Sequence, residues 1–164
     1  MARRIFRFGA VAAAFLFTAP AEAAQPSTAN FVKYGERLQI NGDLTLAFAN
    51  AMEKLLDGNP LVSAVELNSK GEGDVAAAKA LRDFIQKKGL NTFVDEECSN
   101  LCMVVLAGGK RRVMTENARL GFAPPGKADA LREASGLSAD FVAKAAAAPD
   151  TYYPSPDDLL GAGA

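Results

Sequence analysis

Between residues 36 and 147, short apolar runs alternate with longer segments whose apolar residues recur at helical spacing. The run LVSAVEL at 61–67 is short and carries β-branched residues, which is typical of a buried strand. Residues 74–88 follow with an apolar stripe at helical spacing, and Gly89 is a typical helix stop. Strands that alternate with helices predict a single α/β domain with a largely parallel sheet and flanking helices.

The same patterns predict the remaining elements. We expect strands within 36–44, 61–67, 90–94, 111–114 and 118–123, and helices within 45–60, at 74–88 and from about 127 to 147. Residues 99–109 fit either a helix or a buried run. The chain therefore divides into a leader (1–23), the α/β domain (24–148) and a tail rich in Pro and Gly (149–164), which we expect to be ordered only where Tyr152 and Tyr153 pack.

The leader predicts export. Three arginines (Arg3, Arg4 and Arg7) precede an apolar run, and Ala21 and Ala23 are small residues at the two positions that a signal peptidase reads. The apolar run is about a dozen residues, short of the roughly 20 that a spanning helix needs. We expect cleavage after Ala23, a secreted or periplasmic protein and no stable membrane anchor.

The charge of the mature chain argues against nucleic acid as a partner. Removing 23 of the 164 residues leaves 141, which is enough for one real core. The mature chain would carry 15 basic and 18 acidic side chains, a net charge near −3. The one basic cluster, Lys110 to Arg112, is too small to reverse this conclusion. We interpret it as a solvated turn between two elements.

A glycine-rich turn, NSKGEGDV at 68–75, joins the 61–67 strand to the next helix. Such a turn gathers backbone N–H groups in front of the positive end of a helix, where an anion or a developing oxyanion can bind. The spacing is that of neither a phosphate-binding loop nor a dinucleotide fingerprint. A plain tight turn therefore stays open as the alternative.

The order of these pieces resembles a known superfamily. The glycine turn and helix are followed by the 90–94 strand, CSNLCMVVLAGG at 98–109, a basic turn and ENARLGFAPPG at 116–126. Together they resemble the Clp protease proteolytic subunit and crotonase superfamily, and more closely a periplasmic Clp-like branch. Residues 136–164 are similar to the closing helix and Pro-Ser-Pro segment of that branch. The resemblance implies a Clp-crotonase-type fold.

The positions that carry chemistry in that family differ here. The resemblance puts Asn100 where the nucleophilic serine belongs and Ala123 where the histidine belongs, and the chain contains no histidine. An amide is no practical nucleophile and a methyl group cannot accept a proton. The N–H groups of Gly73 and Leu101 match the family's oxyanion-hole donors, and these backbone groups would survive the loss of side-chain chemistry.

Ser99 is the outside candidate for a nucleophile. A related family of signal-peptide peptidases uses a serine with a lysine base on this fold, and a one-residue shift would present Ser99. Four lysines are available, although none has the sequence context of a buried amine: Lys70, Lys110, Lys127 and Lys144. The other interpretation, which we favour, is that Ser99 caps the helix that begins here.

Cys98 and Cys102 leave two alternatives. In an oxidising compartment the pair would be oxidised, and so short a loop would contribute about 2 kcal/mol of stability. Within one ideal helix the Cβ atoms of residues four apart are too far from each other to bridge, so Cys98 would have to lie outside it. A disulfide and two small buried thiols both stay open. With two cysteines and no histidine, we expect no metal and no cofactor.

These observations favour an exported, catalytically inactive Clp-like protein with a binding or assembly role. We expect its partner to be a peptide or a protein that binds in extended form along a sheet edge. A further copy of the chain in a homo-oligomer is the other possible partner. One alternative is a serine hydrolase that uses Ser99 with a lysine. Another is an acyl-thioester enzyme that uses only the oxyanion hole, but an exported protein rarely meets coenzyme A.

Overall fold

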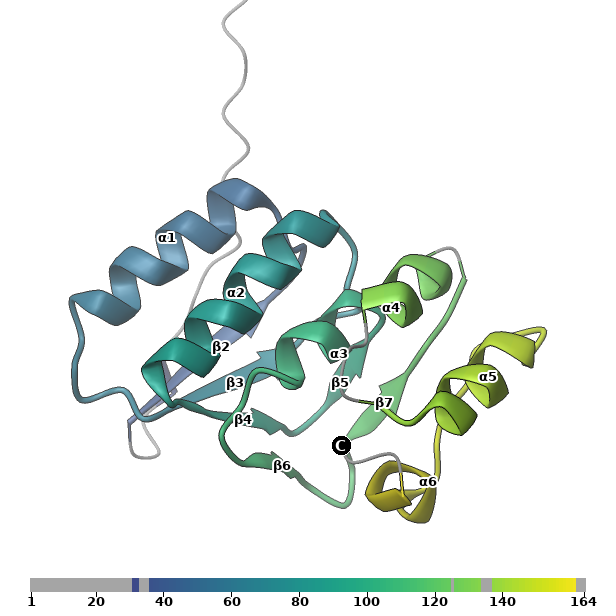
Figure 1. Ribbon diagram of the computed structural model, residues 1–164. Coiled ribbons are helices and arrows are strands. Elements are labelled where there is room, and N and C mark those ends of the chain that lie inside the picture. The colour runs from purple at the N-terminus through teal and green to yellow at the C-terminus, as the bar shows by residue number, and fades with distance from the viewer. Residues whose placement is uncertain (1–30, 33–35, 125, 134–136, 162–164) are drawn as a thin grey trace, which may run out of the picture.

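The computed structural model describes residues 31–32, 36–124, 126–133 and 137–161 (Figure 1). The expected leader at 1–23 lies outside these ranges. Within them, no helix has both the length and the apolar character needed to cross a bilayer.

The described part of the chain forms a five-stranded main sheet in the order β1-β2-β3-β4-β6. Its strands are β1 (Phe31–Val32), β2 (Arg37–Asn41), β3 (Ala64–Asn68), β4 (Asn91–Val94) and β6 (Arg112–Met114). The β1 strand runs antiparallel to β2, and the other neighbours are parallel. The predicted α/β architecture with a largely parallel sheet is confirmed.

Three helices cover one face of this sheet: α1 (Leu46–Asp57), α2 (Val75–Lys88) and α3 (Leu101–Leu106) (Figure 1). The Thr45 side chain caps α1 by accepting a hydrogen bond from the Phe48 N–H at 3.1 Å. The α2 helix ends at Gly89, whose left-handed φ of 65° is the helix stop expected from the sequence. The core lies between helices and sheet, with Phe48, Leu81 and Val94 among its fully buried side chains.

A second, two-stranded sheet pairs β5 (Glu97–Ser99) in parallel with β7 (Arg119–Gly121). No residue pattern predicted β5 as a separate strand, and it lies next to the segment interpreted as a helix or a buried run. The predicted helix cap at Ser99 is wrong, because Ser99 ends β5 and the residue before α3 is Asn100, which makes no side-chain capping bond.

The C-terminal third is more helical than expected. The helical stretch predicted from 127 to 147 is two helices, α4 (Lys127–Glu133) and α5 (Ala139–Ala147), and the tail contains a further helix, α6 (Pro156–Gly161). Between α5 and α6 the chain returns to the small sheet, where Tyr152 forms an antiparallel bridge with Phe122.

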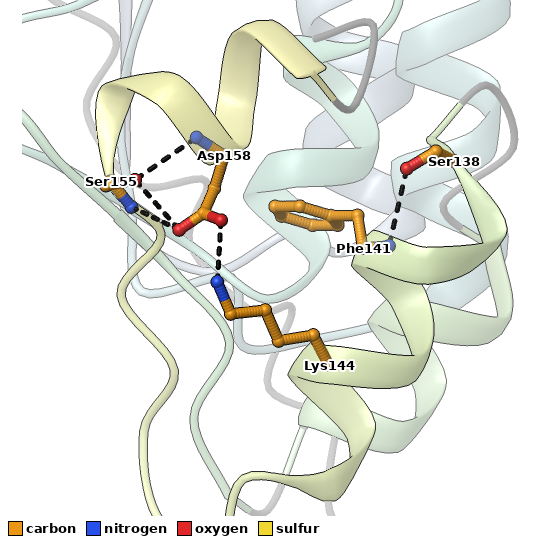
Figure 2. A network of polar contacts seen from close by, with 5 residues as sticks. All are labelled: Ser138, Phe141, Lys144, Ser155 and Asp158. Atoms are coloured by element: carbon orange, nitrogen blue, oxygen red, sulfur yellow. Dashed lines mark hydrogen bonds and ion pairs between the residues drawn. The ribbon is translucent and has the colours of Figure 1, made fainter.

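A polar network joins α6 to α5 (Figure 2). The Lys144 Nζ donates to Asp158 Oδ1 at 2.6 Å, and Asp158 Oδ2 accepts from the N–H and hydroxyl of Ser155. Ser155 Oγ in turn accepts from the Asp158 N–H, so the two residues cap α6 reciprocally. The hydrogen bond from Lys144, followed by those from Ser155, lowers the pKa of Asp158 to about 2.

Candidate functional site

The candidate site is built around a sharp elbow at Asn100. The chain arrives along β5, turns at Asn100 and leaves as α3, with Asn100 at φ 49° and ψ −120°. Among the described residues, Asn100 is the one non-glycine residue with positive φ. This conformation lies outside the left-handed helical region, where ψ is about +47°, and it costs energy for any residue with a Cβ atom. Strained strand-to-helix turns of this kind are where hydrolases present a nucleophile.

The Asn100 side chain is buried and engaged on both ends of its amide. Its Oδ1 accepts a hydrogen bond from the Ala123 N–H at 2.8 Å, and its Nδ2 donates to the Lys70 carbonyl at 3.4 Å. The structure therefore brings together the two positions where the family resemblance puts nucleophile and base. An amide connects them where a hydroxyl and an imidazole would be needed.

Backbone hydrogen bonds fix this elbow on both sides. The Asn100 N–H donates to the Gly121 carbonyl at 2.9 Å, and the Ser99 N–H donates to the Ser69 carbonyl at 3.0 Å. The Ser69 hydroxyl then accepts from the Gly71 N–H at 2.9 Å. The ends of β3, β5 and β7 thus hold the strained residue in place.

The two cysteines flank the elbow. The sulfur atoms of Cys98, in β5, and Cys102, in α3, are 2.02 Å apart, which is the distance of a disulfide. Of the two alternatives that the sequence left open, the structure contains the disulfide. The helix-geometry objection does not apply, because Cys98 lies outside the helix on the far side of the turn.

The glycine turn packs against the start of α3. A Cβ atom on Gly71, whose φ is 68°, would lie 1.9 Å from the Ser99 carbonyl oxygen and 2.5 Å from the Leu101 nitrogen. No side chain fits there. The position requires glycine because its φ is positive and because the turn packs directly against the start of α3. Gly73, at φ 123°, instead lies against the backbone of Leu44. The closest approach to Leu101 is therefore made by Gly71.

A cavity of about 530 Å³ opens beside the elbow. Its lining comprises Lys70, Gly71, Glu72, Gly73, Glu97, Ser99, Asn100, Leu101, Ala123, Pro124, Gly126 and Asp129. Both residues predicted as oxyanion donors, Gly73 and Leu101, thus line one cavity. Within the described part of the chain, neither of their N–H groups donates a hydrogen bond.

Ser99 lines the same cavity but is engaged by a carboxylate. It is 3% exposed, and its hydroxyl donates to Glu97 Oε1 at 3.1 Å. Glu97 also forms an ion pair with Arg119 at 3.6 Å. Of the four lysines considered from the sequence, Lys70 lines this cavity, whereas the Lys127 Nζ donates to the carbonyls of Ala148 and Asp150.

Sequence reasoning missed Glu97 as a site residue. Residues two apart on a strand point to the same side, so recognising β5 would have placed Glu97 beside Ser99. The stretch Glu96-Glu97-Cys98 has none of the apolar alternation that indicates a strand, and this explains why the signal was absent.

Comparisons with known proteins give the fold. No protein-family model and no curated protein matches the sequence. ClpP1 from Listeria monocytogenes superposes with a TM-score of 0.59 at 18% identity, covering 78% of this chain and 87% of that one. An enoyl-CoA hydratase/isomerase family protein from Silicibacter pomeroyi superposes with a TM-score of 0.58 at 15% identity, covering 83% of this chain and 74% of that one. The fold is of the ClpP/crotonase type.

Proposed function

We propose that this chain is an exported, catalytically inactive protein that uses the ClpP/crotonase-type fold to bind extended peptide segments. The observation that carries the proposal is the hydrogen bond from the Ala123 N–H to Asn100 Oδ1. Because of this contact, the position at the elbow is held by the Asn100 amide, which cannot attack a carbonyl carbon.

The loss of hydrolytic chemistry follows from what acyl transfer requires. A hydroxyl nucleophile needs a base that takes its proton, and in this fold type both would have to meet at the elbow. Asn100 supplies a nonbasic amide whose two ends are already bonded, and Ala123 supplies a methyl group. The Ser99 hydroxyl is buried and bonded to Glu97.

The features that support binding remain. The cavity of about 530 Å³ retains two residues whose N–H groups form no internal hydrogen bond in the described chain. Among the described strands, β6 is at one end of the main sheet and has a neighbour on one side only. Main-chain pairing with a sheet edge is a common way to recognise extended peptides. Export, and assembly into a homo-oligomer, are parts of the proposal that await their own tests.

One experiment tests binding and inactivity together. Purified protein lacking residues 1–23 is titrated into three fluorescein-labelled nonapeptides in which valine alternates with glutamate, lysine or threonine, and anisotropy is measured. Each peptide is then recovered and weighed by mass spectrometry. We expect at least one peptide to bind and all three to be recovered intact. Cleavage of any of them contradicts the inactive site, and binding of none contradicts the binding role.

A serine hydrolase that uses Ser99 is the second candidate, because Lys70 lines the same cavity as Ser99. It would require the Ser99 hydroxyl to leave Glu97 and the Lys70 amine to act as its base. Cleavage of a peptide in the experiment above, lost in the variant Ser99→Ala, would favour this candidate.

A further inference from the structure

The β6 strand presents a free edge. Arg111 and Thr115 bracket it with hydrogen bonds to β4, from the Thr92 N–H to the Arg111 carbonyl at 2.9 Å and from the Thr115 N–H to the Val94 carbonyl at 3.0 Å. Backbone groups alternate in direction along a strand, so Val113 also faces β4 while Arg112 and Met114 face away. In the described sheet no strand lies beyond β6. The N–H and carbonyl groups of Arg112 and Met114 are therefore available to a further strand.

An apolar groove adjoins this edge. It has a volume of about 460 Å³ and is lined by Met114, Thr115, Glu116, Ala118, Arg119, Leu120, Tyr153, Pro154 and Leu159. Met114 is 38% exposed and Tyr153 is 52% exposed, which is high for large apolar side chains at one place. A strand added to β6 would place every second side chain on the same side as Met114, over this groove.

Basic side chains surround the same edge. Lys110, Arg111 and Arg112 are exposed, and none of the three forms an ion pair with a described carboxylate. Arg119, which is paired with Glu97, also lines the groove, where Glu116 is the one acidic residue of the lining. The edge is thus locally basic on a chain with a net charge of −1, and it complements an acidic partner.

We infer that β6 receives an extended segment of a partner protein in which acidic residues alternate with large apolar ones. The segment pairs with the free backbone groups of Arg112 and Met114 and inserts an apolar side chain into the groove beside Met114. Its carboxylates, on the alternate residues, lie on the opposite face of the sheet, beside Arg111. This inference rests on the proposed binding function and states where the peptide binds and what chemistry it carries.

The three nonapeptides of the previous section provide the test. We expect the glutamate peptide to bind about tenfold more tightly than the lysine peptide, with the threonine peptide between them. The variant Met114→Pro removes an outward N–H that the fold does not use and should weaken glutamate-peptide binding about tenfold. Met114→Leu keeps that N–H and an apolar side chain and should bind as the wild type does.

A charge reversal provides a second variant that leaves the strand intact. Arg111→Glu should abolish the preference for glutamate over lysine, because the Arg111 side chain is on the face that receives the carboxylates. Lys87→Glu, an exposed site on α2, should leave the preference unchanged. Melting curves show whether Met114→Pro is folded. If it is not, the comparison of Arg111→Glu with Lys87→Glu decides.

The outcomes separate the two proposals. Binding that shows no charge preference and is insensitive to Met114→Pro and Arg111→Glu places the peptide elsewhere and overturns the β6 inference, while the binding function stands. Binding of no peptide overturns both. A concentration-dependent dimer that Met114→Pro abolishes would assign the edge to a second copy of the chain and would also overturn the inference.

Discussion

The Asn100 Oδ1 atom accepts a hydrogen bond of 2.8 Å from the backbone N–H of Ala123, a residue 23 positions further along the chain. The same amide donates to the Lys70 carbonyl in the glycine turn. Because a carboxamide both accepts and donates, Asn100 links the elbow to two other segments at once. A serine has one oxygen, closer to the backbone, and could not make both contacts with the same geometry. The Asn100 amide is thus a structural link between the elbow, the glycine turn and the segment after β7.

This dual role predicts how Asn100 variants affect stability. Asn100→Ala removes the hydrogen bond to Ala123 and leaves an alanine at positive φ, so we expect the free energy of unfolding to fall by about 2–3 kcal/mol. Asn100→Gly loses the same hydrogen bond but no longer strains the backbone, and should be about 1 kcal/mol more stable than Asn100→Ala. Urea unfolding of the three proteins measures both differences. A glycine variant less stable than the alanine variant would contradict the strain at the elbow.

The sequence was informative where the pattern is local. The stripe at 74–88 and its stop at Gly89 correspond to α2, and the 90–94 run contains β4. It failed at Ser99, because the local preference of serine for a helix cap competes with a strand whose partners, Ser69 and Gly121, are distant in sequence. The α6 helix was missed because the three prolines of the tail (Pro149, Pro154 and Pro156) suggested irregular structure, whereas Pro156 is the first residue of the helix, a position that proline favours. The contact between Asn100 and Ala123 is set by how β5 and β7 pair, which periodicity alone does not reveal.

The Cys98–Cys102 disulfide should be present in the exported protein. We expect labelling under denaturing, non-reducing conditions to find no free thiol, and the double variant Cys98→Ala, Cys102→Ala to lose about 2 kcal/mol of stability. Two free thiols in protein matured in an oxidising compartment would contradict the bridge.

Export predicts a specific N-terminus. Mass spectrometry of the protein recovered from its native host should find the mature chain beginning at Ala24, after removal of the arginine-led apolar leader. A soluble cytosolic protein that retains residues 1–23 would refute the prediction.

The α5–α6 contact should depend on pH through Asp158. Its pKa falls from 3.8 to about 2 on folding, so the folded state binds the proton more weakly than the unfolded state. The stabilisation is therefore complete above pH 3.8 and is lost as the pH falls towards 2. Carboxyl NMR titration should find this low pKa in the wild type and a value nearer 3.8 in Lys144→Met. An unchanged pKa in that variant would show that Lys144 is not its main cause.

The central claim is that the elbow cannot form an acyl-enzyme, and reaction with a fluorophosphonate probe tests it most directly. Loss of triad members leaves only roughly 10³–10⁴-fold acceleration over water in known serine hydrolases, too little for labelling of a serine. Purified protein lacking residues 1–23 is incubated with the probe beside the Ser99→Ala variant and an active serine hydrolase. We predict that the hydrolase is labelled and that the wild type and Ser99→Ala are equally unlabelled. Stoichiometric labelling of the wild type that disappears in Ser99→Ala would contradict the account and establish Ser99 as a nucleophile.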